Sequence, residues 1–162
     1  MIFLTVGTQF GFDRLVVAVD QCISDGLINC DIIAQIGEGS YVPRHMKFVK
    51  FMEKGEYDQT ILNSDGLISH AGMGSISMAF SMNKPLLVMP RRACFKEVVN
   101  DHQVEIARLF EQEGYLLMAM DEKDIPAKIT QLLQFVPKRR EAKFQPILDR
   151  LNQFLWGSMN GF

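Results

Sequence analysis

A histidine, two glycines and a serine stand close together in HAGMGS, residues 70–75, directly after a short apolar run. Gly72 and Gly74 lack the Cβ atom that would hold a ligand away from the backbone. The helical stretch that follows would direct free N–H groups and a favourable dipole at an anion. This pattern predicts a phosphate site. The same residues also fit a plain strand-to-helix turn, in which Ser75 caps the helix and His70 is hydrogen-bonded in the interior.

Two further loops carry polar groups of a similar kind. Gly7-Thr8-Gln9 follows the first apolar run and supplies a glycine, a hydroxyl and a carboxamide. NDHQ, residues 100–103, enters a later helix, with Asn100 or Asp101 as its N-cap. Gln103 could both donate to and accept from a sugar hydroxyl. Each loop also has a plain interpretation, as a turn or as solvated surface.

The elements that would hold these loops alternate between strand and helix. Apolar runs predict strands at 2–6, 31–36, 47–51, 66–69, 85–89 and 115–120. Helical spacing predicts helices at 13–25, 56–64, 75–82, 101–114, 124–136 and 143–156, with Asp13 and Gly114 at helix ends. Most strands are apolar on both faces, which is typical of a parallel sheet covered on both sides. We therefore expect one doubly wound, Rossmann-like α/β domain over residues 1–162, with the three loops at the carboxyl edge of its sheet.

Composition excludes several classes of function. The chain has 162 residues and a net charge of -2, which gives no general attraction to nucleic acid. The three cysteines and three histidines show no metal-ligand spacing, so we expect no bound metal and a reduced, cytoplasmic protein. MIFLTVG lacks basic residues before its apolar run and indicates a strand, not a signal peptide. No apolar stretch approaches the roughly 20 residues that span a bilayer.

A dinucleotide site is one alternative for the glycine loop. Residues 72–77 read G-x-G-x-x-S, and Arg91 and Arg92 could hold a 2′-phosphate of NADP. Against this alternative, the third glycine is missing, and the motif follows the fourth predicted strand instead of the first.

Five motifs in order resemble the C-terminal domain of glycosyltransferase family 28. They cover nearly the whole chain: VGTQFGFDRLV (6–16), QIGEGSYVP (35–43), LISHAGMGSI (67–76), KPLLVMPR (84–91) and NDHQVEIA (100–107). The chain is most similar to the small free-standing members of that family, of the dolichol-pathway and bacterial exopolysaccharide type. The resemblance implies half of a GT-B fold that binds a nucleotide-sugar, usually a UDP-sugar, inverts the anomeric centre and needs no metal or other cofactor.

The resemblance also implies a role for each loop. The diphosphate would face Gly72, Gly74 and Ser75, with Gly7, Thr8 and Gln9 at the cleft. The uracil would lie near Phe51 and Met52, and the sugar near Asp101, His102 and Gln103. No residue is an obvious catalytic base; His70 is the best internal candidate, although we expect it to be structural or to face the phosphates.

One position departs from the family pattern. The helix after the glycine loop commonly carries a glutamate that holds the ribose hydroxyls, and Met78 occupies that position here. Either Glu38 or another residue substitutes, or donor affinity is low, or the donor differs. The missing glutamate leaves open a second interpretation, a non-catalytic accessory subunit.

A single domain of this size would hold half of a GT-B cleft. We therefore expect the donor-binding subunit of a two-component transferase, which passes a sugar to a polyprenyl-diphosphate-linked acceptor. A membrane-anchored partner would bind that acceptor and recruit the chain to the cytoplasmic face of a membrane. The apolar stretch LNQFLWGSMNGF, residues 151–162, is expected to help dock the partner and to cause self-association without it.

Overall fold

The structure is a computed structural model that describes residues 1–138 of the chain. The helix expected at 143–156 and the partner-docking stretch at 151–162 lie outside the described residues, so both stay predictions.

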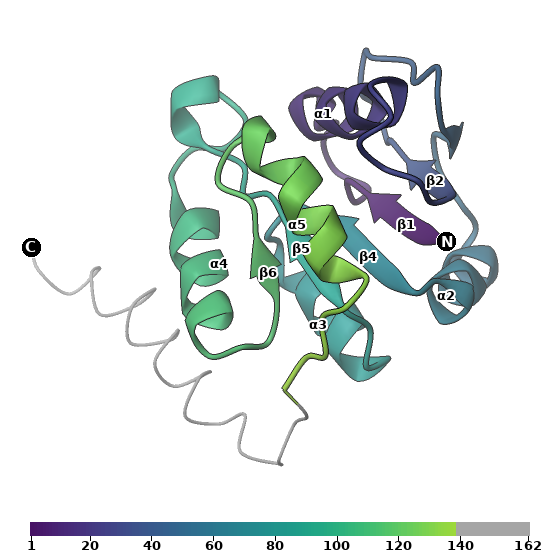
Figure 1. Cartoon of the computed structure of the whole chain (residues 1–162). Coiled ribbons are helices and arrows are strands. Elements are labelled where there is room, and N and C mark those ends of the chain that lie inside the picture. Colours follow the sequence, from purple (N-terminus) through teal and green to yellow (C-terminus); the bar gives the residue numbers. More distant parts are fainter. Residues whose placement is uncertain (139–162) are drawn as a thin grey trace, which may run out of the picture.

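Six parallel strands form one sheet at the centre of the described chain (Figure 1). Their order across the sheet is β3-β2-β1-β4-β5-β6. The strands are β1 (Ile2–Thr5), β2 (Ile32–Gln35), β3 (Lys47–Val49), β4 (Gly66–Ser69), β5 (Leu86–Val88) and β6 (Leu117–Met118). The order reverses beside β1, so the loops after β1 and β4 flank the point at which a doubly wound sheet opens for a ligand.

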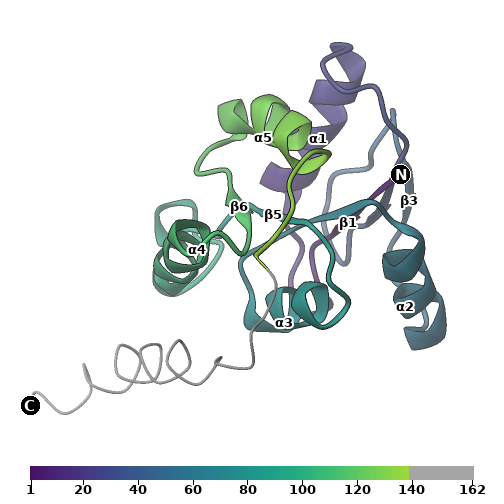
Figure 2. The same cartoon turned by 60° about the horizontal axis from the view of Figure 1, so that its bottom comes forward.

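Helices cover both faces of this sheet (Figure 2). The α-helices are α1 (Asp13–Ser24), α2 (Lys54–Asn63), α3 (Met73–Ser81), α4 (His102–Gln112) and α5 (Ile125–Leu132). One core cluster joins α1 and α5 to strand residues such as Ile2 and Leu4. The other joins α2, α3 and α4 to Phe3, which points to the opposite face from its neighbours. The predicted Rossmann-like α/β class is confirmed.

The ends of the elements differ from the sequence expectation by a few residues. Strand β6 keeps only two of the six expected residues, and it pairs with β5 alone at the edge of the sheet. Helix α3 begins two residues early, because the Ile76 N–H already bonds to the Gly72 carbonyl. Asp13 is the first residue of α1 instead of its N-cap, and its carboxylate accepts from the Ser40 N–H.

No helix among residues 1–138 is both long and apolar enough to cross a bilayer.

Helix α4 ends as its sequence predicts. Gly114 takes a φ of +78°, its N–H bonds to the Glu111 carbonyl, and the Tyr115 N–H bonds to the Phe110 carbonyl. This pair of bonds is a Schellman motif, which turns the chain from α4 toward β6.

Candidate donor-binding cleft

A cleft of about 600 Å³ opens at the carboxyl ends of the strands. The loops after β1, β4 and β5 supply most of its lining. Of the predicted donor-binding residues it brings together Gly7, Thr8, Gln9, His70, Gly72, Gly74, Ser75 and Gln103. Three loops that are distant in sequence therefore meet at one hollow.

The His70 ring fixes the close packing of two of these loops. A Cβ atom on Gly72 would lie 2.3 Å from Nε2 of His70, and one on Gly7 would lie 3.0 Å from Cε1. Gly7 also has a φ of +81°, which favours glycine. Gly72 and Gly7 thus make room for the histidine. Gly74 has no atom within 4 Å of its ideal Cβ, so its missing side chain leaves open space in the cleft.

His70 is held as a neutral imidazole. The Ser69 hydroxyl donates its single hydrogen to the Thr5 carbonyl at 2.7 Å, so its oxygen can only accept from Nδ1 of His70, 3.3 Å away. Burial, together with a smaller contribution from repulsion by Arg91, lowers the pKa of His70 from 6.5 to about 4. A group with that pKa is a weak base near neutral pH, which favours a positioning role over general-base catalysis.

The first turn of α3 presents unpaired backbone donors to the cleft. The N–H groups of Met73, Gly74 and Ser75 precede the first helical hydrogen bond and bond to no other described residue. Ser75 does not cap this helix. The N-cap residue is Gly72, so Ser75 lies inside the first turn of the helix. Ser75 also lines the cleft. An anion at this position would meet N–H groups and the positive end of the helix dipole.

The residues expected at the sugar are divided by the fold. Gln103 lines the cleft, and its Oε1 accepts from the Arg91 N–H at 3.0 Å. Asp101 and His102 are exposed and lie outside the lining. The Asp101 carboxylate instead accepts from the Ala93 N–H at 2.7 Å and so shapes the loop after β5.

Phe51 and Met52, the residues expected at the uracil, also lie outside this lining, although Met52 is hydrogen-bonded to a residue that lines the cleft. Phe51 is exposed, and the Met52 N–H donates to Oε1 of Gln35 at 3.0 Å. Gln35 is buried at the carboxyl end of β2, lines the cleft, and donates from Nε2 to the Gly7 carbonyl. Sequence reasoning missed Gln35, although a glutamine at the end of the apolar run DIIAQI is a usable signal.

Met78 lines the cleft, whereas the candidate substitute Glu38 does not. The Glu38 side chain is 67% exposed and lies 3.7 Å from Nζ of Lys50. The glycine-rich turn that contains Glu38 packs closely against the start of α1, since a Cβ atom on Gly39 would lie 2.3 Å from Asp13 Oδ1. No carboxylate therefore lines the described cleft at the usual ribose position.

Arg91 and Arg92 do not form the paired phosphate clamp of the dinucleotide alternative. Arg92 binds the Asp121 carboxylate at 2.8 Å and lies outside the cleft. Arg91 is 4% exposed and its Nη2 is occupied by backbone carbonyls. The glycine loop also follows β4, not β1, which departs from the dinucleotide fold.

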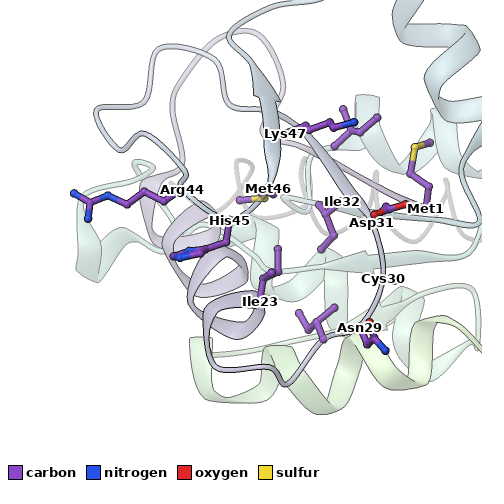
Figure 3. Close-up of a pocket in the computed structure, with 12 residues that line it drawn as sticks. Met1, Ile23, Asn29, Cys30, Asp31, Ile32, Arg44, His45, Met46 and Lys47 are labelled. Atoms are coloured by element: carbon purple, nitrogen blue, oxygen red, sulfur yellow. The ribbon is translucent and has the colours of Figure 1, made fainter.

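A larger hollow, of about 860 Å³, lies at the opposite edge of the sheet (Figure 3). Met1, Asp31 and Lys47 at the starts of strands and Ile23 of α1 contribute to it. Its His45 is held by Asp20, which accepts from the His45 N–H at 2.8 Å. Ligands of parallel sheets bind at the carboxyl edge, so the smaller cleft is the candidate ligand site.

Metal ligands are not gathered in the part of the chain that the structure describes. Among residues 1–138 there is no group of three or more histidine, cysteine, aspartate or glutamate side chains placed to hold an ion.

Comparisons with known proteins agree with this architecture. The model of the glycosyltransferase family 28 C-terminal domain matches residues 1–152. A "UDP-N-acetylglucosamine transferase subunit ALG13" of Mus musculus is 32% identical over 123 residues, 70% of this chain and 10% of the relative. The subunit of the same name from Cryptococcus neoformans (strain JEC21) is 31% identical over 105 residues, 59% of this chain and 50% of the relative. The chain thus spans from a tenth to about half of the length of these curated relatives.

Solved structures give the same fold. An NMR structure of ALG13 has a TM-score of 0.59 at 22% identity and covers 93% of both chains. Acinetobacter baumannii MurG has a TM-score of 0.61 at 15% identity, over 93% of this chain and 49% of MurG. With the family model matching nearly the whole sequence, the chain belongs to the glycosyltransferase family 28 C-terminal domain family.

Proposed function

We propose that this chain is the donor-binding subunit of a two-component, inverting glycosyltransferase. It would bind a UDP-sugar and transfer the sugar to a polyprenyl-diphosphate-linked acceptor held by a membrane-anchored partner at the cytoplasmic face. The observation that carries the proposal is the cleft, which is lined by Met73, Gly74 and Ser75, whose backbone N–H groups bond to no other described residue.

The chemistry of the cleft suits a leaving nucleoside diphosphate. Breaking the glycosidic bond leaves negative charge on the β-phosphate, which fixed donors and a helix dipole stabilise without reorganisation. Described residues supply such donors and no metal-ligand cluster, so we propose that the reaction proceeds without a bound divalent ion. Gln103 offers its free amide nitrogen to a sugar hydroxyl, since its Oε1 is already used by the Arg91 N–H.

UDP-N-acetylglucosamine is the donor to test first, because the curated relatives are named as transferase subunits for that sugar. Their word "subunit" also supports a partner chain for this protein. No residue of the described cleft is an obvious general base, since the pKa of His70 is lowered to about 4. We therefore propose that the base comes from the partner.

A second candidate function follows from one observation, the thioether of Met78 in the cleft. A subunit that binds its donor weakly could serve only to stabilise or enhance a catalytic partner. The two functions differ in what the cleft must do, because an accessory subunit does not need to bind the donor.

A transfer assay with the co-purified partner separates them. Wild-type complex and complex carrying Gly74→Val are incubated with a panel of UDP-sugars and a lipid-linked acceptor. A donor subunit loses transfer with Gly74→Val, whereas an accessory subunit retains it. No transfer by the wild-type complex with any UDP-sugar would contradict the proposed donor class.

A further inference from the structure

Strand β3 forms one outer edge of the sheet, beside α2 (Figure 2). It pairs with β2 alone, and no other strand of the described chain lies along its outer side. We call residues 42–51, which contain β3 and the loop residues that flank it, the β3 edge. This surface is separate from the donor cleft, because none of its residues is among those that line the cleft.

The β3 edge is cationic on a chain that is acidic as a whole. Residues 42–51 hold Arg44, Lys47 and Lys50 and no aspartate or glutamate, whereas the whole chain has a net charge of -2. Arg44 and Lys47 are exposed and form no ion pair with a carboxylate of the described chain. In Figure 3 the Arg44 side chain extends away from the neighbouring hollow. Lys50 lies 3.7 Å from Glu38, but both side chains are exposed, so this ion pair is weak.

Apolar side chains are exposed along the same segment. Val42 is 60% exposed, Phe48 38% and Phe51 45%. Lysines on an edge strand commonly protect it against pairing with another chain, and that explanation accounts for Lys47 and Lys50. It does not account for the three exposed apolar side chains, which favour association instead of preventing it. The combination of cations and apolar side chains suits a partner surface that is both anionic and apolar.

We propose that the β3 edge docks this chain on an anionic lipid surface. Its cations lie against the phosphate groups, and Val42, Phe48 and Phe51 enter the apolar boundary beneath them. Neighbouring residues of a strand point to opposite faces of the sheet, so Lys47 and Phe48 flank the edge on its two sides. A bilayer that meets the sheet side-on contacts both of them.

The position of the β3 edge is compatible with the proposed function. The cleft opens at the carboxyl ends of the strands, whereas the β3 edge runs along the side of the sheet. Docking through this side leaves the cleft open and holds it close to a lipid-linked acceptor. The choice of a lipid surface over an acidic protein rests on that proposed acceptor. A second copy of the chain is a poorer occupant, because a symmetric contact would bring the same three cations together.

The test is co-sedimentation of the full 162-residue chain with vesicles of phosphatidylcholine, or of phosphatidylcholine and phosphatidylglycerol in equal amounts. Arg44→Gln/Lys47→Gln removes two cations of the β3 edge, and Val42→Ser/Phe48→Ser removes two of its apolar side chains. Arg108→Gln/Lys123→Gln is the matched control, because it also removes one arginine and one lysine, from exposed positions outside the β3 edge. Circular dichroism confirms that each variant is folded.

Wild-type protein should sediment with the anionic vesicles, less so at high salt, and not with the neutral vesicles. Arg44→Gln/Lys47→Gln should bind anionic vesicles about 30-fold more weakly, the effect of two cations near an anionic membrane, and the control less than about threefold more weakly. Val42→Ser/Phe48→Ser should bind about fivefold more weakly or worse. The basic residues at 138–143 also attract anionic vesicles, but they are the same in all four proteins, so the differences between variants are decisive.

Vesicle binding equal to that of the control, by either variant of the β3 edge, overturns the inference, as does a wild-type chain that binds no anionic vesicles. Loss of the partner subunit from Arg44→Gln/Lys47→Gln, with vesicle binding as in the control, would assign the edge to an acidic protein and overturn the lipid surface. Calorimetry with UDP separates this inference from the proposed function. A wild-type chain that binds vesicles but not UDP refutes the proposed function alone, whereas normal UDP binding without vesicle binding refutes the lipid surface alone.

Discussion

The two glycines of HAGMGS should respond in opposite ways to the same substitution. In Gly72→Ala, the new Cβ would lie 2.3 Å from Nε2 and 2.8 Å from Cδ2 of His70. The ring has little room to move, because its other side meets Gly7 and its Nδ1 is bonded to Ser69. Overpacking of this kind typically costs about 1–3 kcal/mol, so Gly72→Ala should lower the free energy of unfolding by that amount.

Gly74→Ala should leave the fold intact. No atom lies within 4 Å of its ideal Cβ, and the position is inside α3, where alanine is favoured over glycine by up to about 1 kcal/mol. The methyl group nevertheless enters the space before the unpaired N–H groups. UDP affinity should therefore fall in Gly74→Ala and be lost in Gly74→Val.

Urea denaturation followed by circular dichroism measures the stability of these variants, and calorimetry measures their UDP affinity. Gly72→Ala serves as the stability contrast and wild-type protein as the binding control. A folded Gly74→Val protein that binds UDP as wild type does would refute the phosphate assignment. Equal destabilisation by alanine at both positions would refute the distinct roles of the glycines.

Three other predictions concern protonation, the ribose contact and metal. The pKa of His70 is about 4 in the folded chain and about 6.5 in the unfolded chain, so between these pH values only the unfolded chain binds a proton at His70. Acidification from pH 7.5 to 4.5 should therefore lower the free energy of unfolding by about 2–3 kcal/mol more in wild type than in His70→Gln, as measured by urea titration. Equal losses of stability in the two proteins would contradict the buried neutral imidazole. Met78→Glu should add a charge-assisted contact to the ribose and so tighten UDP binding by about 1–2 kcal/mol, as measured by calorimetry. Weaker UDP binding in this variant would mean that the pocket is apolar at this position. Transfer by the complex should survive excess EDTA, and strict dependence on added Mg²⁺ or Mn²⁺ would contradict the metal-free mechanism.

The sheet could be predicted because its strands are buried on both faces. Runs such as IFLT and GLIS need no tertiary information to be recognised as central parallel strands. The edge of the sheet was less predictable. YLLMAM is equally apolar, but with one neighbouring strand only Leu117 and Met118 are paired.

The site could be predicted only in part, because the spacing of glycines in a sequence does not show which atoms occupy the space of their missing side chains. A G-x-G pattern suggests close approach to the backbone, but it cannot show that Gly72 makes room for His70 whereas Gly74 faces open space. The burial of Gln35 and Arg91 was equally hidden, since their partners lie in loops far away in sequence.

An amide chemical-shift titration of the 162-residue chain with UDP tests the location of the donor site most directly. The largest shifts should fall on residues 72–75, on residues 7–9 and on Gln103, while residues around the opposite hollow, such as His45, stay unchanged. Shifts confined to that opposite hollow, or no shifts at saturating UDP, would contradict the assignment of this cleft as the nucleotide-sugar site.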